Sequence, residues 1–109
     1  MKNRIVRFSK CGGPEVLEME KKIARFCKRK FCVGTASGTD ALYLAVRALE
    51  IGKGDEVITT PFTAIPTYSA IKQVNAKPIF VDIDPNTFLI DIKKIKQKVT
   101  ENTKAILPV

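Results

Sequence analysis

The spacing of the apolar residues alternates along this chain between the helical period and the strand-like period, and turn residues fall where the spacing changes. Short apolar runs at residues 31–35, 56–60, 77–84 and 104–109 favour strands, and segments with helical spacing separate them. Strands that alternate with helices predict a parallel or mostly parallel sheet covered on both faces. The chain has 109 residues, of which 45% are hydrophobic, so we expect one globular domain.

Two helices are expected before the second strand. Pro14 and Glu15 suit the first turn of the first helix, which continues to about Cys27. The second helix, over residues 40–50, is apolar on most sides, so we expect it to be largely buried. Residues 52–55 end it, with a glycine where a left-handed cap costs little.

The later helices explain much of the positive charge. The third helix is expected near Pro66, and Asp91 is expected to cap a fourth, lysine-rich helix. The net charge is +8, from 19 Lys and Arg against 11 Asp and Glu. The apolar residues of the fourth helix share one face, which leaves its lysines in solvent, and the basic residues 28–30 follow a helix end. No aromatic residues interleave with either cluster to stack bases, so we expect no nucleic-acid partner.

The cysteines and the N-terminal residues favour a reducing compartment. Cys11, Cys27 and Cys32 are an odd number without C-x-x-C spacing, and the chain has no histidine, so no metal site is predicted. The first ten residues lack the apolar core of a secretory signal, and no apolar run is long enough to cross a bilayer. We therefore expect a cytoplasmic protein without a membrane partner, whose cysteines are reduced.

The stretch "VGTASGTDAL" at residues 33–42 combines the end of an expected strand, a turn with glycine and the start of a helix. In open α/β sheets, ligands lie beyond the carboxyl ends of strands. Gly38 would let the backbone approach an anion closely, and the hydroxyls of Ser37 and Thr39 would add hydrogen-bond donors. The alternative is that Ser37, Thr39 or Asp40 only caps the helix. The turn alone does not decide between a phosphate site and a simple cap.

Two further stretches, at residues 54–71 and 76–88, follow this turn. Their spacing brings the ends of three expected strands to one edge of the sheet. Five pieces of the chain together resemble the N-terminal part of the DegT/DnrJ/StrS family of sugar aminotransferases: "GPEVLEMEKKIARF", "VGTASGTDALYLAVRAL", "GDEVITTPFT", "KPIFVDIDPNTF" and "TKAILPV". The resemblance implies pyridoxal 5′-phosphate as the cofactor. It also implies an α/β fold of the aspartate aminotransferase type (fold type I), with a mostly parallel sheet and flanking helices, of which this chain is part of the large domain.

The resemblance also implies a role for the turn. In the family, the S-G-T segment grips the cofactor phosphate, so Ser37, Gly38 and Thr39 are the expected cofactor-binding residues, with Asp40 starting the helix behind them. This implication agrees with the anion interpretation of the turn.

One position departs from the family pattern. The segment after "TP" usually supplies an aromatic ring that stacks on the pyridine, whereas Ala64 aligns there in this chain. Either Phe62 or Tyr68 supplies the stacking ring instead, or the chain belongs to a subgroup with a small residue at this position. For Phe62 and Tyr68 taken individually, packing in the core is the favoured role. Asp82 and Asp84 are similar in spacing to paired catalytic carboxylates, but the resemblance makes "VDIDP" a strand end that shapes the site.

The resemblance places the catalytic residues outside this sequence. Transamination needs a lysine that moves the proton and a carboxylate that keeps the pyridine nitrogen protonated. In the family, both lie beyond the segment that matches "TKAILPV". We therefore expect residues 1–109 to be a single incomplete domain without catalytic residues of its own, whether it is a truncated piece, part of a split gene or a decayed gene. Uncovered apolar faces and an unpaired sheet edge would make the isolated chain self-associate.

Three functions follow as hypotheses. The first is a fragment, inactive alone, of an aminotransferase that acts on a nucleotide-linked keto sugar with glutamate as the donor, and that works as a homodimer or with a complementing fragment. The second is a non-catalytic module that binds pyridoxal phosphate or a partner protein. The third is an unrelated α/β domain that binds a nucleotide or a phosphate.

Overall fold

The computed structural model describes residues 13–109, and these fall into two compact units that divide between Thr35 and Ala36. Cys11, one of the three cysteines considered above, lies outside the described residues. Within residues 13–109, no helix is both long enough and apolar enough to cross a membrane.

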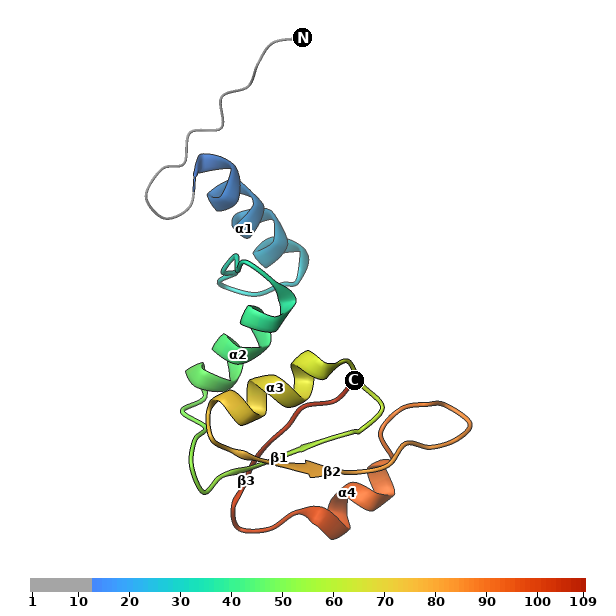
Figure 1. Cartoon of the computed structure of the whole chain (residues 1–109). Coiled ribbons are helices and arrows are strands. Elements are labelled where there is room, and N and C mark those ends of the chain that lie inside the picture. The colour runs from blue at the N-terminus through green and yellow to red at the C-terminus, as the bar shows by residue number, and fades with distance from the viewer. Residues whose placement is uncertain (1–12) are drawn as a thin grey trace. The chain divides into compact units, whose positions relative to one another are not determined.

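The first unit contains one helix, α1, at Pro14–Phe26 (Figure 1). The expected start is confirmed, because Pro14 lies in the first turn together with Glu15. Ala24 is the buried residue of α1. The apolar side chains of the helix that are exposed are Val16, Leu17, Met19, Ile23 and Phe26.

The strand expected at residues 31–35 is wrong. These residues form no regular structure, and the side chains of Phe31 and Val33 are exposed. A strand needs a neighbour to accept and donate its backbone hydrogen bonds. The described part of the first unit contains no other strand that could supply them.

The second unit contains a parallel sheet of three strands in the order β2–β1–β3 (Figure 1). The strands are β1 at Glu56–Thr59, β2 at Lys77–Phe80 and β3 at Thr103–Ile106. These three strands confirm the expected pattern of strands and helices. The middle strand β1 is buried along its whole length. The edge strand β2 is shorter than the run expected at residues 77–84, and the side chains of Lys77 and Phe80 are exposed.

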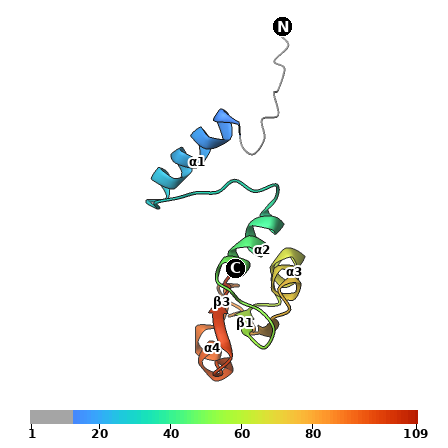
Figure 2. The ribbon, with the colours of Figure 1, turned by 90° about the vertical axis from the view of Figure 1, so that its left-hand side faces the viewer.

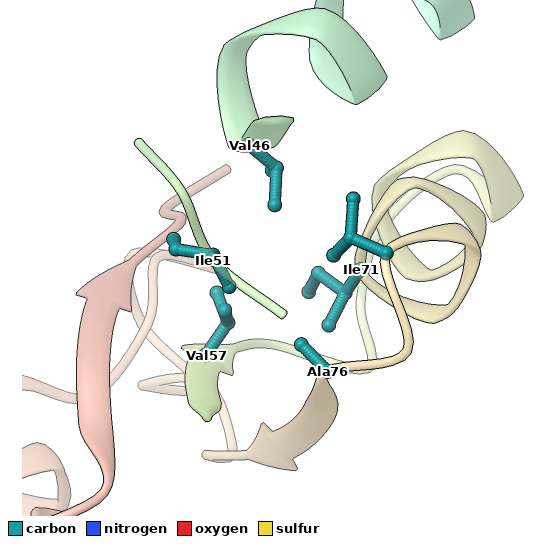
Figure 3. Close-up of a cluster of buried hydrophobic side chains, with 6 residues drawn as sticks. Val46, Ile51, Val57, Ile71 and Ala76 are labelled. Carbon is teal, nitrogen blue, oxygen red and sulfur yellow. The ribbon is translucent and has the colours of Figure 1, made fainter. Parts of the chain in front are cut away.

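Helices cover both faces of the sheet (Figure 2). Helices α2 at Gly38–Ala48 and α3 at Ile65–Gln73 cover one face, and α4 at Ile92–Lys98 covers the other. Between α2, α3 and β1 lies a buried cluster, shown in Figure 3: Val46, Ile51, Val57, Ile71, Val74 and Ala76. On the other face, Ile95 of α4 packs against a smaller cluster of Ile58, Val81 and Ile90.

Two expectations for α2 are wrong. Val46 is the one fully buried residue of this helix, and Leu44 is about half exposed, so α2 is not largely buried. The described residues cover α2 from one side, through α3 and the sheet. The left-handed residue after the helix is Glu50, with φ of 57°, rather than a glycine; Gly54, with φ of 96°, forms the later turn.

Candidate functional site

The topology provides two places for a ligand in the second unit. One is the N-terminus of α2, where backbone N–H groups have no acceptor within the helix. The other is the edge where β1, β2 and β3 end, since ligands of open α/β sheets lie beyond the carboxyl ends of the strands.

Ser37 caps α2. Its Oγ accepts a hydrogen bond from the backbone N–H of Asp40 at 3.1 Å and donates one to Asp40 Oδ2 at 2.8 Å. The cap predicted from the sequence is therefore confirmed for Ser37, and Asp40 is its partner. A cap of this kind stabilises a helix by about 1 kcal/mol and needs no ligand.

The same turn also has the donors that an anion needs. The backbone N–H groups of Gly38 and Thr39 lie in the first turn of α2, where the helix itself offers no acceptor. A Cβ placed on Gly38 would meet no atom from other parts of the described chain within 4 Å, so this side of the residue is open. A phosphate fits these donors, provided that the Ser37 hydroxyl turns from the carboxylate of Asp40 towards the ligand.

Threonine hydroxyls hold the segment that follows β1. The Thr59 Oγ1 donates to the carbonyl oxygen of Leu107 at 2.8 Å, which ties the ends of β1 and β3 together. The Thr60 Oγ1 accepts from the N–H of Phe62 at 3.2 Å, and the hydroxyls of Thr63 and Thr67 lie 2.7 Å apart. Thr59, Thr60 and Thr67 are buried. The backbone at the end of β1 is therefore fixed by hydrogen bonds.

The structure separates the two aromatic residues proposed near Ala64. Ala64 is the N-cap of α3 and is exposed. Tyr68 stacks on Phe80 of β2, with ring centroids 6.2 Å apart, which is a packing role. The ring of Phe62 is exposed and its centroid lies 6.0 Å from that of Phe88. Phe62 is therefore the ring of the two that is more available to a ligand.

Asp82 and Asp84 make separate contacts. The Asp84 carboxylate accepts the backbone N–H of Asn86 at 2.8 Å, and this hydrogen bond is the main cause that lowers its pKa below the usual value. The Asp82 carboxylate accepts the N–H of Ile83 and lies 3.9 Å from the ammonium of Lys94. The contacts of both carboxylates are thus local, and a role of this strand end in shaping the site stays a prediction.

Two features were not predicted from the sequence. The Glu20 carboxylate accepts the N–H of Gly34 at 2.6 Å, which ties the segment after α1 back to that helix within the first unit. Phe88 has a left-handed backbone, with φ of 59°, and pairs with Phe62. Hydrophobic spacing contains no signal for either feature.

The described residues form an α/β protein with a parallel sheet and with a helix, α2, that is capped by Ser37. The chain belongs to the DegT/DnrJ/EryC1/StrS aminotransferase family, whose sequence profile matches residues 6–109. This membership confirms the resemblance and rules out an unrelated α/β domain.

Curated relatives and solved structures agree with this membership. The chain is 46% identical over 97 residues to the UDP-2-acetamido-2-deoxy-3-oxo-D-glucuronate aminotransferase of Pseudomonas aeruginosa, covering 89% of this chain and 27% of that protein. It is 47% identical to the dTDP-3-amino-3,6-dideoxy-alpha-D-galactopyranose transaminase of Aneurinibacillus thermoaerophilus, with the same coverage of each chain.

Two solved structures show the same fold. The chain matches S. venezuelae DesV in complex with a ketimine intermediate, with a TM-score of 0.86, 37% identity, and coverage of 90% of this chain and 26% of that one. It matches NtdA of Bacillus subtilis with bound cofactor PMP, with a TM-score of 0.86, 38% identity, and coverage of 90% and 22%. The chain thus spans about a quarter of the length of these proteins.

Proposed function

We propose that this chain is part of a pyridoxal-phosphate-dependent aminotransferase that transfers an amino group to a nucleotide-linked keto sugar, with glutamate as the amino donor. The observation that carries the proposal is family membership over residues 6–109. The two curated relatives described above are named for amino transfer to UDP- and dTDP-linked sugars. The N-terminus of α2 adds a set of donors that suits the cofactor phosphate.

Ser37, Gly38 and Thr39 are the residues that we propose hold the phosphate. The N–H groups of Gly38 and Thr39 would donate to its oxygens, and the partial positive charge of the helix N-terminus would favour its negative charge. The Ser37 hydroxyl would donate a further hydrogen bond. When bound, the cofactor supplies an electron sink for the reaction.

We further propose that residues 1–109 are the N-terminal part of one large domain, and that the catalytic lysine belongs to a part of the protein outside this sequence. The relatives are about four times as long as this chain, which supports the proposal. The isolated chain is then expected to be inactive. A homodimer in the cytoplasm is the assembly that we propose for the whole protein.

Replacing Gly38 with alanine tests the phosphate site. The added methyl meets no protein atom, so Gly38→Ala should leave the free energy of unfolding unchanged or raise it by about 0.5 kcal/mol. We expect the methyl to crowd a phosphate held by the N–H groups of Gly38 and Thr39, so the affinity for pyridoxal phosphate should fall by about tenfold, or about 1.4 kcal/mol. Equilibrium dialysis at constant ionic strength measures this affinity.

Gly52→Ala is the matched control, because a Cβ there meets only the Val74 carbonyl oxygen at 3.8 Å and Gly52 lies outside the turn. Equal affinities for Gly38→Ala and the unsubstituted chain would show that the phosphate binds elsewhere.

The native length of the polypeptide tests the proposed relation to a larger enzyme. We expect peptides containing "TASGTDAL" to come from a band several times heavier than 12.1 kDa in denaturing separation of a native extract. A band at 12.1 kDa would favour the second candidate, a module that keeps the phosphate site without catalysis.

A further inference from the structure

Two aromatic rings lie together in solvent where β1 and β2 end. Phe62 follows β1 by three residues, and Phe88 lies in the loop after β2, drawn in orange in Figure 1. The ring centroids are 6.0 Å apart and the ring planes are inclined by 36°. Phe62 is 60% exposed and Phe88 is 61% exposed. Among residues 13–109, both rings are therefore exposed and lie outside the two buried clusters.

Phe88 has an unfavourable backbone for its residue type. Its φ of 59° is in the left-handed region, which a bulky aromatic residue rarely adopts. In the described part of the chain, the other non-glycine residues with positive φ are Lys28, Glu50 and Asn75, and each lies two residues beyond the end of a helix, where this conformation is common. Phe88 instead follows the turn at residues 85–87, between Ile83 and Ile90, which form an antiparallel bridge. A left-handed residue is common at the end of such a turn, but it is usually glycine or asparagine rather than phenylalanine.

The loop does not need an aromatic ring to close. The N–H of Phe88 donates to the carbonyl oxygen of Asp84, and the N–H of Asp84 donates to that of Leu89, both at 2.8 Å. Asparagine or glycine would make the same backbone bond with less strain. Strained residues of this kind concentrate at ligand sites, where the side chain gives a gain that the fold itself does not.

The position of the pair favours a ligand with an apolar ring face. Both rings lie near the edge of the sheet where β1 and β2 end, and in open α/β sheets ligands lie beyond this edge. Phe62, with Pro61 and Thr63, lines a shallow hollow of about 290 Å³. Phenyl rings offer no hydrogen-bond donor to a phosphate group. The C–H face of a sugar ring therefore suits this surface better than a nucleotide diphosphate.

We propose that Phe62 and Phe88 form the surface on which the sugar ring of the substrate rests, with Phe88 holding the ring of Phe62 in place. The inference rests on the proposed function, which supplies a sugar as the substrate class. It assigns to the pair the recognition of the sugar, and neither the cofactor phosphate nor the nucleotide.

Substitutions at the two positions test the assignment in the protein at its native length. Isothermal titration measures the affinity for UDP-N-acetylglucosamine and for UDP, and likewise for dTDP-glucose and for dTDP. For each nucleotide, the quantity compared is the affinity for the nucleotide sugar divided by the affinity for the nucleotide alone. Phe62→Ala and Phe88→Asn should each lower this ratio by roughly three- to tenfold, because stacking on the ring is lost. Phe88→Asn should also raise the Tm, because the left-handed strain is relieved.

Controls separate the proposal from the proposed function and from a structural role. Phe31→Ala removes an exposed ring of the first unit and should leave the ratio unchanged, and Phe88→Tyr should retain it. The affinity for pyridoxal phosphate should change by less than about twofold in all four variants.

A loss of the affinity for pyridoxal phosphate in Phe62→Ala would place the cofactor on the pair and overturn the proposal. An unchanged ratio in Phe88→Asn, or binding of neither sugar by the unsubstituted protein, would also overturn it. Failure of pyridoxal phosphate to bind the unsubstituted protein would refute the proposed function instead.

Discussion

At the residue scale, Glu56 connects three parts of the second unit. It is the first residue of β1 and is buried, and its carboxylate accepts the Thr100 hydroxyl at 2.7 Å and the Lys77 ammonium at 3.0 Å. The hydrogen bond from Thr100 is the largest cause that lowers the pKa of Glu56 below its ordinary value, followed by the one from Lys77. The ionised carboxylate therefore joins β1 to β2 and to the segment before β3.

Glu56→Gln should lower the free energy of unfolding at pH 7, because the amide cannot replace the charged acceptor. Since the pKa is lower in the folded state, the stabilisation is fully present above the unfolded-state pKa and is lost as the pH falls through the folded-state pKa. The difference between the variant and the unsubstituted chain should therefore shrink below about pH 4. Urea unfolding at pH 7, 5 and 3 measures it.

Glu18→Gln is the control, since Glu18 forms an exposed pair with Lys22 on α1 and should cost less than about 0.5 kcal/mol. A difference for Glu56→Gln that stays constant from pH 7 to pH 3 would contradict the assignment to its charge.

At the element scale, β1 organises the core. Val57 points into the cluster with α2 and α3, and Ile58 lies in the cluster beneath α4, so successive residues serve opposite faces. Both side chains are fully buried. The middle strand is thus the element on which both apolar layers depend.

Ile58→Ala should destabilise the second unit by about 2–5 kcal/mol, through lost burial and the cavity left behind. Ile92→Ala in α4 should change the stability by less than about 0.5 kcal/mol, because that side chain is 73% exposed. Unfolding by urea, followed by circular dichroism, compares the two variants. Similar losses in both would mean that Ile58 is not a core residue.

Local sequence signals predicted helix caps and turns better than they predicted features that depend on distant neighbours. Asp91 was expected to cap the fourth helix, and its carboxylate does accept the N–H of Lys93. The run at residues 31–35 has strand composition, yet a strand depends on neighbours that composition does not reveal. The turn at Ser37 was found from its glycine and hydroxyl residues. The left-handed Phe88 was missed, because its conformation opposes the preference of phenylalanine.

At the scale of the whole molecule, the sheet has an open side. Within residues 13–109, β3 has no neighbour on the side away from β1, and Ile106 is 48% exposed. Unpaired backbone groups beside apolar side chains are a template for association. This edge supports the proposal that further parts of the protein complete the domain.

The isolated chain should therefore self-associate, and Ile106→Lys should reduce the association by placing a charge on the edge strand. Sedimentation velocity over a hundredfold range of concentration would show the unsubstituted chain shifting to larger species and the variant remaining mainly monomeric. Circular dichroism of both confirms that the sheet is retained. A chain that is monomeric at every concentration would refute this expectation.

The left-handed Phe88 also has an evolutionary consequence. Repeated rounds of mutation and selection for heat resistance alone should exchange it for asparagine or glycine, since either relieves the strain. Under the proposed function, selection that also requires the cell to make the amino sugar should preserve the ring. The residue that survives at this one position would therefore record whether recognition of a sugar was still under selection.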